Sequence, residues 1–132
     1  MTIKYNKDGW AVQVNKTDRG CVYEFQRQFT LSGAAENFDL SVPFPFELNR
    51  IEYFSDDATA KSFTERILSG NVTAGSYDEI MNEVNNIDIP VAYVPTGSEG
   101  VYTQSPLIIR TAMSASTAAK LLTKKVILRR LS

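Results

Sequence analysis

Histidine is absent from this chain of 132 residues, and Cys21 is its only cysteine. Without histidine, neither a Ser-His-Asp nor a Cys-His catalytic centre can form within one chain. Zinc sites built from clustered histidine or cysteine ligands are excluded as well, and no disulfide can form inside the monomer. Cys21 alternates with Tyr23 and Phe25, which predicts a buried and unreactive thiol. We therefore expect no cofactor and no metal centre, and we exclude catalysis by a Ser-His-Asp or Cys-His centre.

Long apolar runs are also missing. No stretch approaches the roughly 18 residues that a membrane-spanning helix needs. The first ten residues, MTIKYNKDGW, lack the apolar core of a signal peptide, so we expect neither export by that route nor membrane association. Hydrophobic residues at 43% and charged residues at 22% are typical of a soluble globular protein. Residues 1–132 contain no internal repeat or linker and are predicted to form a single domain.

Acidic residues are missing from the last part of the chain. Residues 101–132 have a charge of +6, whereas residues 1–100 have a charge of −7. The basic residues are Arg110, Lys120, Lys124, Lys125, Arg129 and Arg130. They could form a nucleic-acid patch, or they could pair with acidic strands of the same fold or of a partner. The pI of about 5.4 and the lack of a known nucleic-acid motif favour pairing, so we expect no nucleic-acid binding.

Alternation of apolar and polar residues dominates what is present. In residues 21–31 the odd positions are apolar, except Arg27, and most even positions are polar. The pattern returns in residues 37–44, after a short polar link that is either a hairpin turn or a crossing between sheets. A period of two is typical of half-buried antiparallel strands.

Further strands follow from turn and breaker residues. Pro43 and Pro45 cannot donate ladder hydrogen bonds, so the chain should leave its sheet there. The inward spacing slips from two to three between Leu48 and Ile51, which predicts a bulge at Asn49-Arg50. Other predicted strands begin at Trp10 and cover 91–94, 107–113 and 123–131, with short helical turns around 78–85 and 116–122. About eight short strands predict an all-β, antiparallel, jelly-roll-like β-sandwich.

Residues 1–9 are either an extended N-terminal arm that orders on a neighbouring subunit or an ordinary edge strand. The arm and the basic C-terminal strands are our candidates for a partner-binding surface. The candidate residues are Ile3, Tyr5, Lys120, Lys124, Lys125, Arg129 and Arg130.

Residues 46–78 carry a pattern of two strands around a polar turn, followed by a small-residue loop. The elements are Phe46, Leu48 and Ile51; then Phe63, Thr64, Leu68, Ser69 and Gly70; then Tyr77 and Asp78. This pattern resembles small structural proteins of tailed bacteriophages. The resemblance covers about a quarter of the chain, and it implies a virion component without enzymatic activity.

From this resemblance we expect a capsid decoration or cement protein, assembled in the host cytoplasm. Its partners would be the major capsid protein and further copies of itself. A tail, neck or fibre component is the nearest alternative. A carbohydrate-binding module is a second alternative, since Trp10, Tyr93 and Tyr102 could stack on sugar rings.

Acidic residues suggest two further sites. Asp56-Asp57 could join a calcium site, but no EF-hand spacing accompanies it, and a solvated turn is the simpler explanation. Glu47, Glu52 and Glu65 could supply a carboxylate pair for glycoside hydrolysis, but nothing in the sequence places two of them at the required separation, and exposed strand acids are the simpler explanation.

Overall fold

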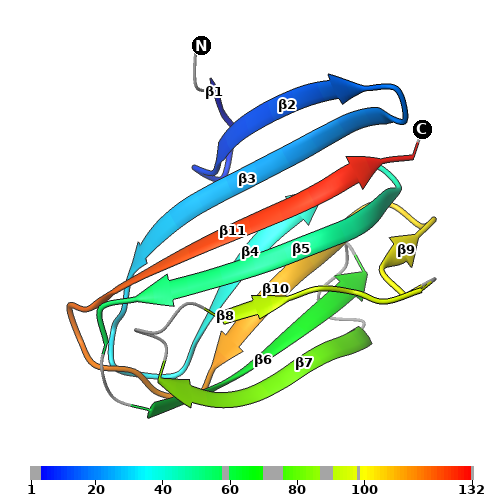
Figure 1. The fold of residues 1–132 in the computed structure, drawn as a ribbon. Helices are drawn as coiled ribbons and strands as arrows, with labels where there is room; N and C mark the ends of the chain where they lie inside the picture. The colour runs from blue at the N-terminus through cyan, green and yellow to red at the C-terminus, as the bar shows by residue number, and fades with distance from the viewer. Residues whose placement is uncertain (1–3, 58–59, 70–75, 87–90, 98, 132) are drawn as a thin grey trace.

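Two antiparallel β-sheets pack face to face in the computed structural model (Figure 1). The structure describes residues 4–57, 60–69, 76–86, 91–97 and 99–131. Its strands are β1 (Lys4–Tyr5), β2 (Ala11–Thr17), β3 (Gly20–Thr30), β4 (Glu36–Val42), β5 (Phe46–Ser55), β6 (Ala60–Ser69), β7 (Ser76–Asn86), β8 (Val91–Tyr93), β9 (Val101–Tyr102), β10 (Leu107–Met113) and β11 (Leu121–Arg130). The predicted all-β sandwich is therefore confirmed.

The sheets differ in width. Seven strands form the larger sheet in the order β1-β2-β3-β11-β5-β8, with β9 also paired to β5. The smaller sheet has the order β4-β10-β6-β7. The described residues form eleven strands instead of about eight, because β7 and β9 were not predicted and β1 was predicted only as one of two alternatives for residues 1–9. No helix in the described ranges is long and apolar enough to cross a membrane.

The link from β3 to β4 and the link from β5 to β6 both cross from one sheet to the other. β3 belongs to the larger sheet and β4 to the smaller one, and β5 and β6 are divided in the same way. The expected departure at Pro43 and Pro45 is confirmed, since β4 ends at Val42 and β5 begins at Phe46. The bulge is confirmed too: Arg50 pairs with Ile127 and Leu48 with Leu128, which leaves Asn49 between them without a partner.

The two predicted helical turns were wrong. Residues 78–85 lie in β7, which pairs with β6 along its length. A bulge there leaves Ile80 between the paired residues Glu79 and Met81, so Ile80 and Met81 both pack against the core. In residues 116–122, Ala119 has a φ of 69°, which no helix accommodates, and β11 already begins at Leu121.

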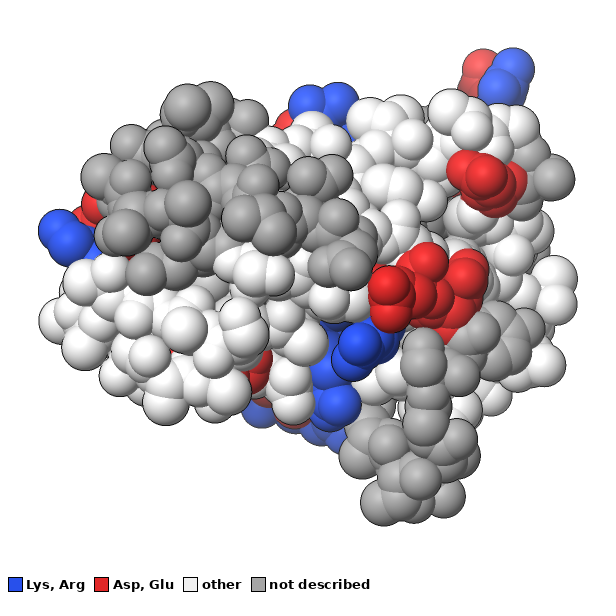
Figure 2. Space-filling model, turned by 90° about the horizontal axis from the view of Figure 1, so that it is seen from below, with Lys and Arg blue, Asp and Glu red and all other residues white. Residues whose placement is uncertain are grey.

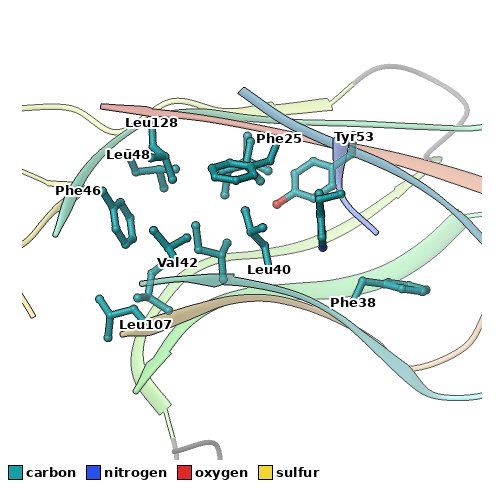
Figure 3. Close-up of a cluster of buried hydrophobic side chains, with 14 of the residues drawn as sticks. Phe25, Phe38, Leu40, Val42, Phe46, Leu48, Tyr53, Leu107 and Leu128 are labelled. Carbon is teal, nitrogen blue, oxygen red and sulfur yellow. The ribbon is translucent and has the colours of Figure 1, made fainter. Parts of the chain in front are cut away.

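The apolar core lies between the sheets (Figure 3). Inward positions of β4, β5, β10 and β11 are fully or almost fully buried, as their alternation predicted. Trp10 is also buried, and its ring meets Phe29 edge-on with 5.5 Å between the centroids. Arg27, the exception in the apolar face of β3, places its guanidinium 4.8 Å from the centre of the Phe29 ring.

The structure also tests the expectations for residues 1–9 and for Cys21. Lys4 and Tyr5 pair with Val12 and Ala11, so this part of residues 1–9 is an edge strand; Ile3 lies outside the described residues. The prediction of a buried thiol was wrong, because Cys21 is only half-buried. It lies opposite Lys16, in the part of the β2–β3 hairpin where β2 is exposed.

Candidate contact surface on the larger sheet

One cross-strand row runs across six strands of the larger sheet. The row consists of Tyr5, Ala11, Gln26, Lys125, Glu52 and Ala92, each paired with the next. Residues paired directly across strands point to the same face. Because their neighbours along the strands, such as Val126, Ile51 and Phe25, are buried between the sheets, the row points away from the core. We call this side of the larger sheet the outer face.

Exposed apolar side chains gather on the outer face and its edge. Tyr5 is 69% exposed in the row itself, and Phe54, opposite Thr123, is 50% exposed. Val101 pairs with Glu47 and is 43% exposed, and Val94 directly follows β8 at the same edge. Val14 is exposed to a similar extent as Val101 but pairs with the inward-facing Tyr23, so it points to the opposite side.

The charged side chains of the outer face are arranged as ion pairs. Lys125 is bonded to Glu24, and Arg50 to Glu52 on the same strand. The hydrogen bond with Glu24 raises the pKa of Lys125. Pairs that remain partly exposed contribute at most about 1 kcal/mol each to folding. They keep the outer face close to electrically balanced.

A shallow depression lies on the outer face beside Phe54. Its volume is about 340 Å³. It is lined by Gln26, Arg50, Glu52, Tyr53, Phe54, Val91, Ala92, Thr123 and Lys125. An aromatic ring is thus placed next to amide, hydroxyl and charged groups that can form hydrogen bonds.

The predicted basic contact residues are split between the faces of β11. Lys125 and Arg129 lie on the outer face. Lys125 pairs across the strands with Gln26 and Glu52, and Arg129 pairs with Val22 and Glu47. Arg130 stacks its guanidinium 4.6 Å from the centre of the Phe44 ring. Lys120 is exposed in the turn before β11.

Lys124 must be removed from the predicted contact residues. Its side chain is fully buried and is bonded to the buried Glu65 of β6. An alternating strand turns every second residue inward, and Lys124 lies between Leu122 and Val126 on the buried side. The alternation itself was the signal that could have placed it in the core.

The acidic partners of the C-terminal strands come from the rest of the fold. Arg110 makes two hydrogen bonds to Asp39, of 2.8 and 2.9 Å, and the Asp39 hydrogen bond raises the pKa of Arg110. Arg129 Nε lies 3.5 Å from Glu47 Oε1. The ion pairs of Lys124 with Glu65 and of Lys125 with Glu24 are described above. Pairing within the fold therefore accounts for most of the basic tail. On the face in Figure 2, small acidic and basic groups also lie next to one another.

The aromatic residues proposed for sugar stacking are poorly placed for that role. Trp10 and Tyr102 are buried, and Tyr93 is only partly exposed. Tyr102 instead donates its hydroxyl to Asp78 at 3.0 Å. The half-exposed Phe54 was not singled out from the sequence, because its position after the bulge determines which face it reaches.

The acidic candidates are also explained by the fold. Asp57 is buried and accepts hydrogen bonds of 3.0 Å from both the backbone NH and the hydroxyl of Thr117, so the solvated-turn explanation was wrong for it. Among the described residues, no group of three potential metal-ligating side chains occurs. Glu65 points into the core whereas Glu47 and Glu52 point to the outer face, so Glu65 pairs with neither of them.

A buried polar cluster connects the two sheets and was not predicted. Tyr53 and Lys124 are cross-strand partners in the larger sheet, and Thr111 and Glu65 are partners in the smaller one. Lys124 Nζ donates to Glu65 Oε1, and the Thr111 hydroxyl donates to Glu65 Oε2 at 2.6 Å. Burial lowers the pKa of Lys124, against the opposing effect of Glu65, and burial together with Glu65 raises the pKa of Tyr53.

Comparison with known proteins shows a similar fold at low sequence identity. No protein family and no curated protein sequence matches the chain. The crystal structure of PirA matches with a TM-score of 0.53 at 9% identity, over 85% of this chain and 96% of that one. This likeness shows a shared β-sandwich fold.

Two more distant structures have TM-scores below 0.5. One is the carbohydrate-binding module CBM27-1 of Caldicellulosiruptor saccharolyticus in complex with mannohexaose, with a TM-score of 0.41, 12% identity, and coverage of 89% of this chain and 81% of that one. The other is the enzymatically active domain of tailspike protein 4 of bacteriophage CBA120, with a TM-score of 0.44 and 17% identity. It is matched over 92% of this chain but only 18% of its own length.

Proposed function

We propose that this protein is a non-enzymatic structural component of a tailed-phage virion, which decorates the capsid and binds the major capsid protein. It would be assembled in the host cytoplasm and act as a homo-oligomer. The resemblance of residues 46–78 to phage structural proteins supports the class of protein. The observation that carries the choice of surface is the outer face, where exposed apolar side chains accompany paired charges.

The dimensions of the outer face suit a protein–protein contact. Six neighbouring strands about 4.8 Å apart span about 24 Å, and seven residues along a strand span a similar length. The resulting area of about 600 Å² is comparable to the roughly 800 Å² that each partner contributes to a standard interface. Interfaces of this size combine buried apolar residues with a polar rim. Tyr5, Phe54 and Val101 would supply the apolar contacts, and the ion-paired side chains of β3, β5 and β11 would supply polar contacts between them.

The mechanism would be the burial of this face across junctions between capsid subunits. Apolar area removed from water stabilises an interface by about 25 cal/mol per Å² before the costs of association are subtracted. The symmetry of a shell repeats the same contact many times, so a modest contact stabilises the particle as a whole.

The test is to mix the purified protein with capsids that lack it and to sediment the mixture. We expect binding at several hundred copies per particle, on the order of the number of subunits in a shell with repeated symmetry, and a more heat-resistant shell. Copies in the tens or fewer would identify a neck, tail or fibre component instead. A complete absence of binding would contradict a role on the capsid.

The outer face can be tested with a matched pair of variants. Val101→Glu places a charge on the outer face, whereas Val14→Glu places the same charge at a similarly exposed position on the other side. We expect Val101→Glu to lose capsid binding and Val14→Glu to retain it. Equal binding by both variants would show that a different surface makes the contact.

Oligosaccharide binding is the second candidate function, and the depression beside Phe54 favours it. Sugar rings stack on aromatic faces while their hydroxyls exchange hydrogen bonds with groups such as those of Gln26 and Glu52. A glycan array would test this function with the wild-type protein and with Phe54→Ala. Binding that Phe54→Ala abolishes would make the protein a receptor-binding module, and silence on the array would remove this candidate.

A further inference from the structure

We infer that Lys124 and Glu65 form an intramolecular isopeptide bond that joins the two sheets of the sandwich covalently. Neither residue contributes to the outer face, so the inference is independent of the partner that the outer face binds. Lys124 belongs to β11 of the larger sheet and Glu65 to β6 of the smaller one. The bond would therefore connect the two layers through the middle of the core.

The two reacting groups are already in contact and shielded from water. Both side chains have an exposed fraction of 0%, and Lys124 Nζ donates a hydrogen bond to Glu65 Oε1. The neighbouring inward residues on the same strands are Leu122 and Val126 beside Lys124, and Phe63 and Ile67 beside Glu65. Contact between reactants that are held in place replaces a bimolecular encounter by an intramolecular step.

The surroundings favour the uncharged amine that amide formation requires. A buried ion pair carries a desolvation cost of several kcal/mol per ion, on the order of its own attraction. Transfer of a proton from the Lys124 ammonium to Glu65 Oε1, along the existing hydrogen bond, gives a neutral amine and a neutral carboxylic acid. Burial lowers the pKa of Lys124, which acts in the same direction. A neutral amine in a dry site is a nucleophile.

The reaction is a condensation that releases one water molecule. The lone pair of Lys124 Nζ attacks Cδ of Glu65, a C–N bond forms, and the carbonyl electron pair moves onto Oε2. Thr111 already donates its hydroxyl to Oε2, so this oxygen is the one stabilised as it becomes negative. When the C=O bond re-forms, the C–Oε1 bond breaks, and the protonated Oε1 takes a second proton from Nζ and leaves as water. The product is a neutral secondary amide, and no oxidant or cofactor takes part.

The hydroxyl of Tyr53 provides a second donor beside the same carboxylate. It is buried, it makes no well-formed hydrogen bond to any described residue, and Glu65 contributes to its raised pKa. Its oxygen points into the space between the sheets (Figure 3). A buried donor that lacks a well-formed hydrogen bond costs about 1–3 kcal/mol. The developing charge on Glu65 and then the carbonyl oxygen of the amide would give it an acceptor.

The test is the intact mass of the purified full-length protein under denaturing conditions. We expect the mass of the sequence less one water molecule, and digestion should yield one peptide in which Lys124 is joined to Glu65. An imide at Asp8-Gly9 would cause the same mass loss, so fragmentation must localise the deficit. The full sequence mass after refolding and prolonged incubation would overturn the inference, and so would a deficit localised to Asp8-Gly9.

Two variants separate bond formation from folding. Replacing a buried ion pair with apolar residues of similar size is often tolerated, so Lys124→Met combined with Glu65→Met should fold and show the full mass. A deficit that persists in this double variant would overturn the inference. Tyr53→Phe keeps the ring and removes the donor, and we expect a mixture of linked and unlinked chains. Complete linkage at an unchanged rate would contradict the role assigned to the Tyr53 hydroxyl.

Discussion

The indole nitrogen of Trp10 donates a hydrogen bond of 3.0 Å to the backbone carbonyl of Asp39. Trp10 immediately precedes β2 of the larger sheet, whereas Asp39 lies in β4 at the edge of the smaller one. The bond therefore connects the two sheets and gives the backbone carbonyl of Asp39, on the edge strand β4, a hydrogen-bond donor. Edge strands carry backbone groups that are otherwise unpaired, so this contact also blocks part of β4 from pairing with another chain.

Trp10→Phe should separate the packing of the indole from its hydrogen bond. The smaller ring keeps most of the apolar contact with Phe29 but leaves the Asp39 carbonyl without its donor. We expect a loss of about 1–3 kcal/mol in the free energy of unfolding. Trp10→Ala should cost about 3–5 kcal/mol, because it also opens a cavity. Urea denaturation of both variants measures the difference, and equal losses would show that the hydrogen bond contributes more than the ring.

Asp57→Ala should destabilise the fold far more than Asp56→Ala. Asp57 is buried and accepts two hydrogen bonds from the half-buried Thr117, and we expect the loss of both bonds to cost about 2–3 kcal/mol. Asp56 is exposed and accepts one bond of 2.7 Å from the Leu121 amide, so its loss should cost about 1 kcal/mol. Chemical denaturation of the two variants compares adjacent aspartates directly. A strong stabilisation of the wild type by calcium would show that the pair binds a cation instead.

Gly100→Ala should be costly, and Gly97→Ala serves as its control. Both glycines have positive φ, of 84° and 63°, so both alanines carry a backbone penalty of about 1–2 kcal/mol. A Cβ at Gly100 would also lie 2.9 Å from Pro95 Cγ and 3.0 Å from the Leu48 carbonyl oxygen, whereas a Cβ at Gly97 meets no atom within 4 Å. We expect a clearly lower melting temperature for Gly100→Ala. Identical melting temperatures would contradict the close packing at Gly100.

Tyr53 should make the protein less stable at high pH. Burial is the largest cause of its raised pKa, and the Glu65 carboxylate adds to it in chains without the Lys124 linkage, so the hydroxyl stays protonated in the folded state when it ionises in the unfolded state. The unfolded state then binds fewer protons, and the free energy of unfolding falls as the pH rises above about 10, by up to about 1.4 kcal/mol per pH unit. Tyr53→Phe should show a shallower decline in urea titrations between pH 9 and 11. Parallel profiles would mean that Tyr53 titrates normally.

The sequence predicted the strands whose two faces differ in polarity. The strands β3, β4, β10 and β11 are half-buried, so their alternation is visible in the residues and predicts their existence and inward positions. β7 was missed because its residues include a bulge at Ile80 that interrupts the period of two. Its conformation depends on pairing with β6, which is a tertiary interaction and not a local preference.

The candidate surface was only partly predictable for a related reason. Tyr5, Lys125 and Arg129 were among the predicted contact residues. Tyr5 and Lys125 lie in one row only because the four strands β1, β2, β3 and β11 align in register. Register between distant strands cannot be read from one strand alone. Lys124 was misplaced because a basic side chain was taken as exposed, although its position between Leu122 and Val126 indicated the core.

The position of β11 has a consequence for how the chain folds as it is made. β11 is the last strand of the described chain, yet it lies between β3 and β5 near the middle of the larger sheet (Figure 1). Until the ribosome has released residues 121–130, β3 and β5 have no strand between them and the larger sheet cannot close. The sandwich can therefore close only after residues 121–130 have left the ribosome. Nascent chains that end early expose two unpaired strand edges, which makes incomplete products prone to aggregation.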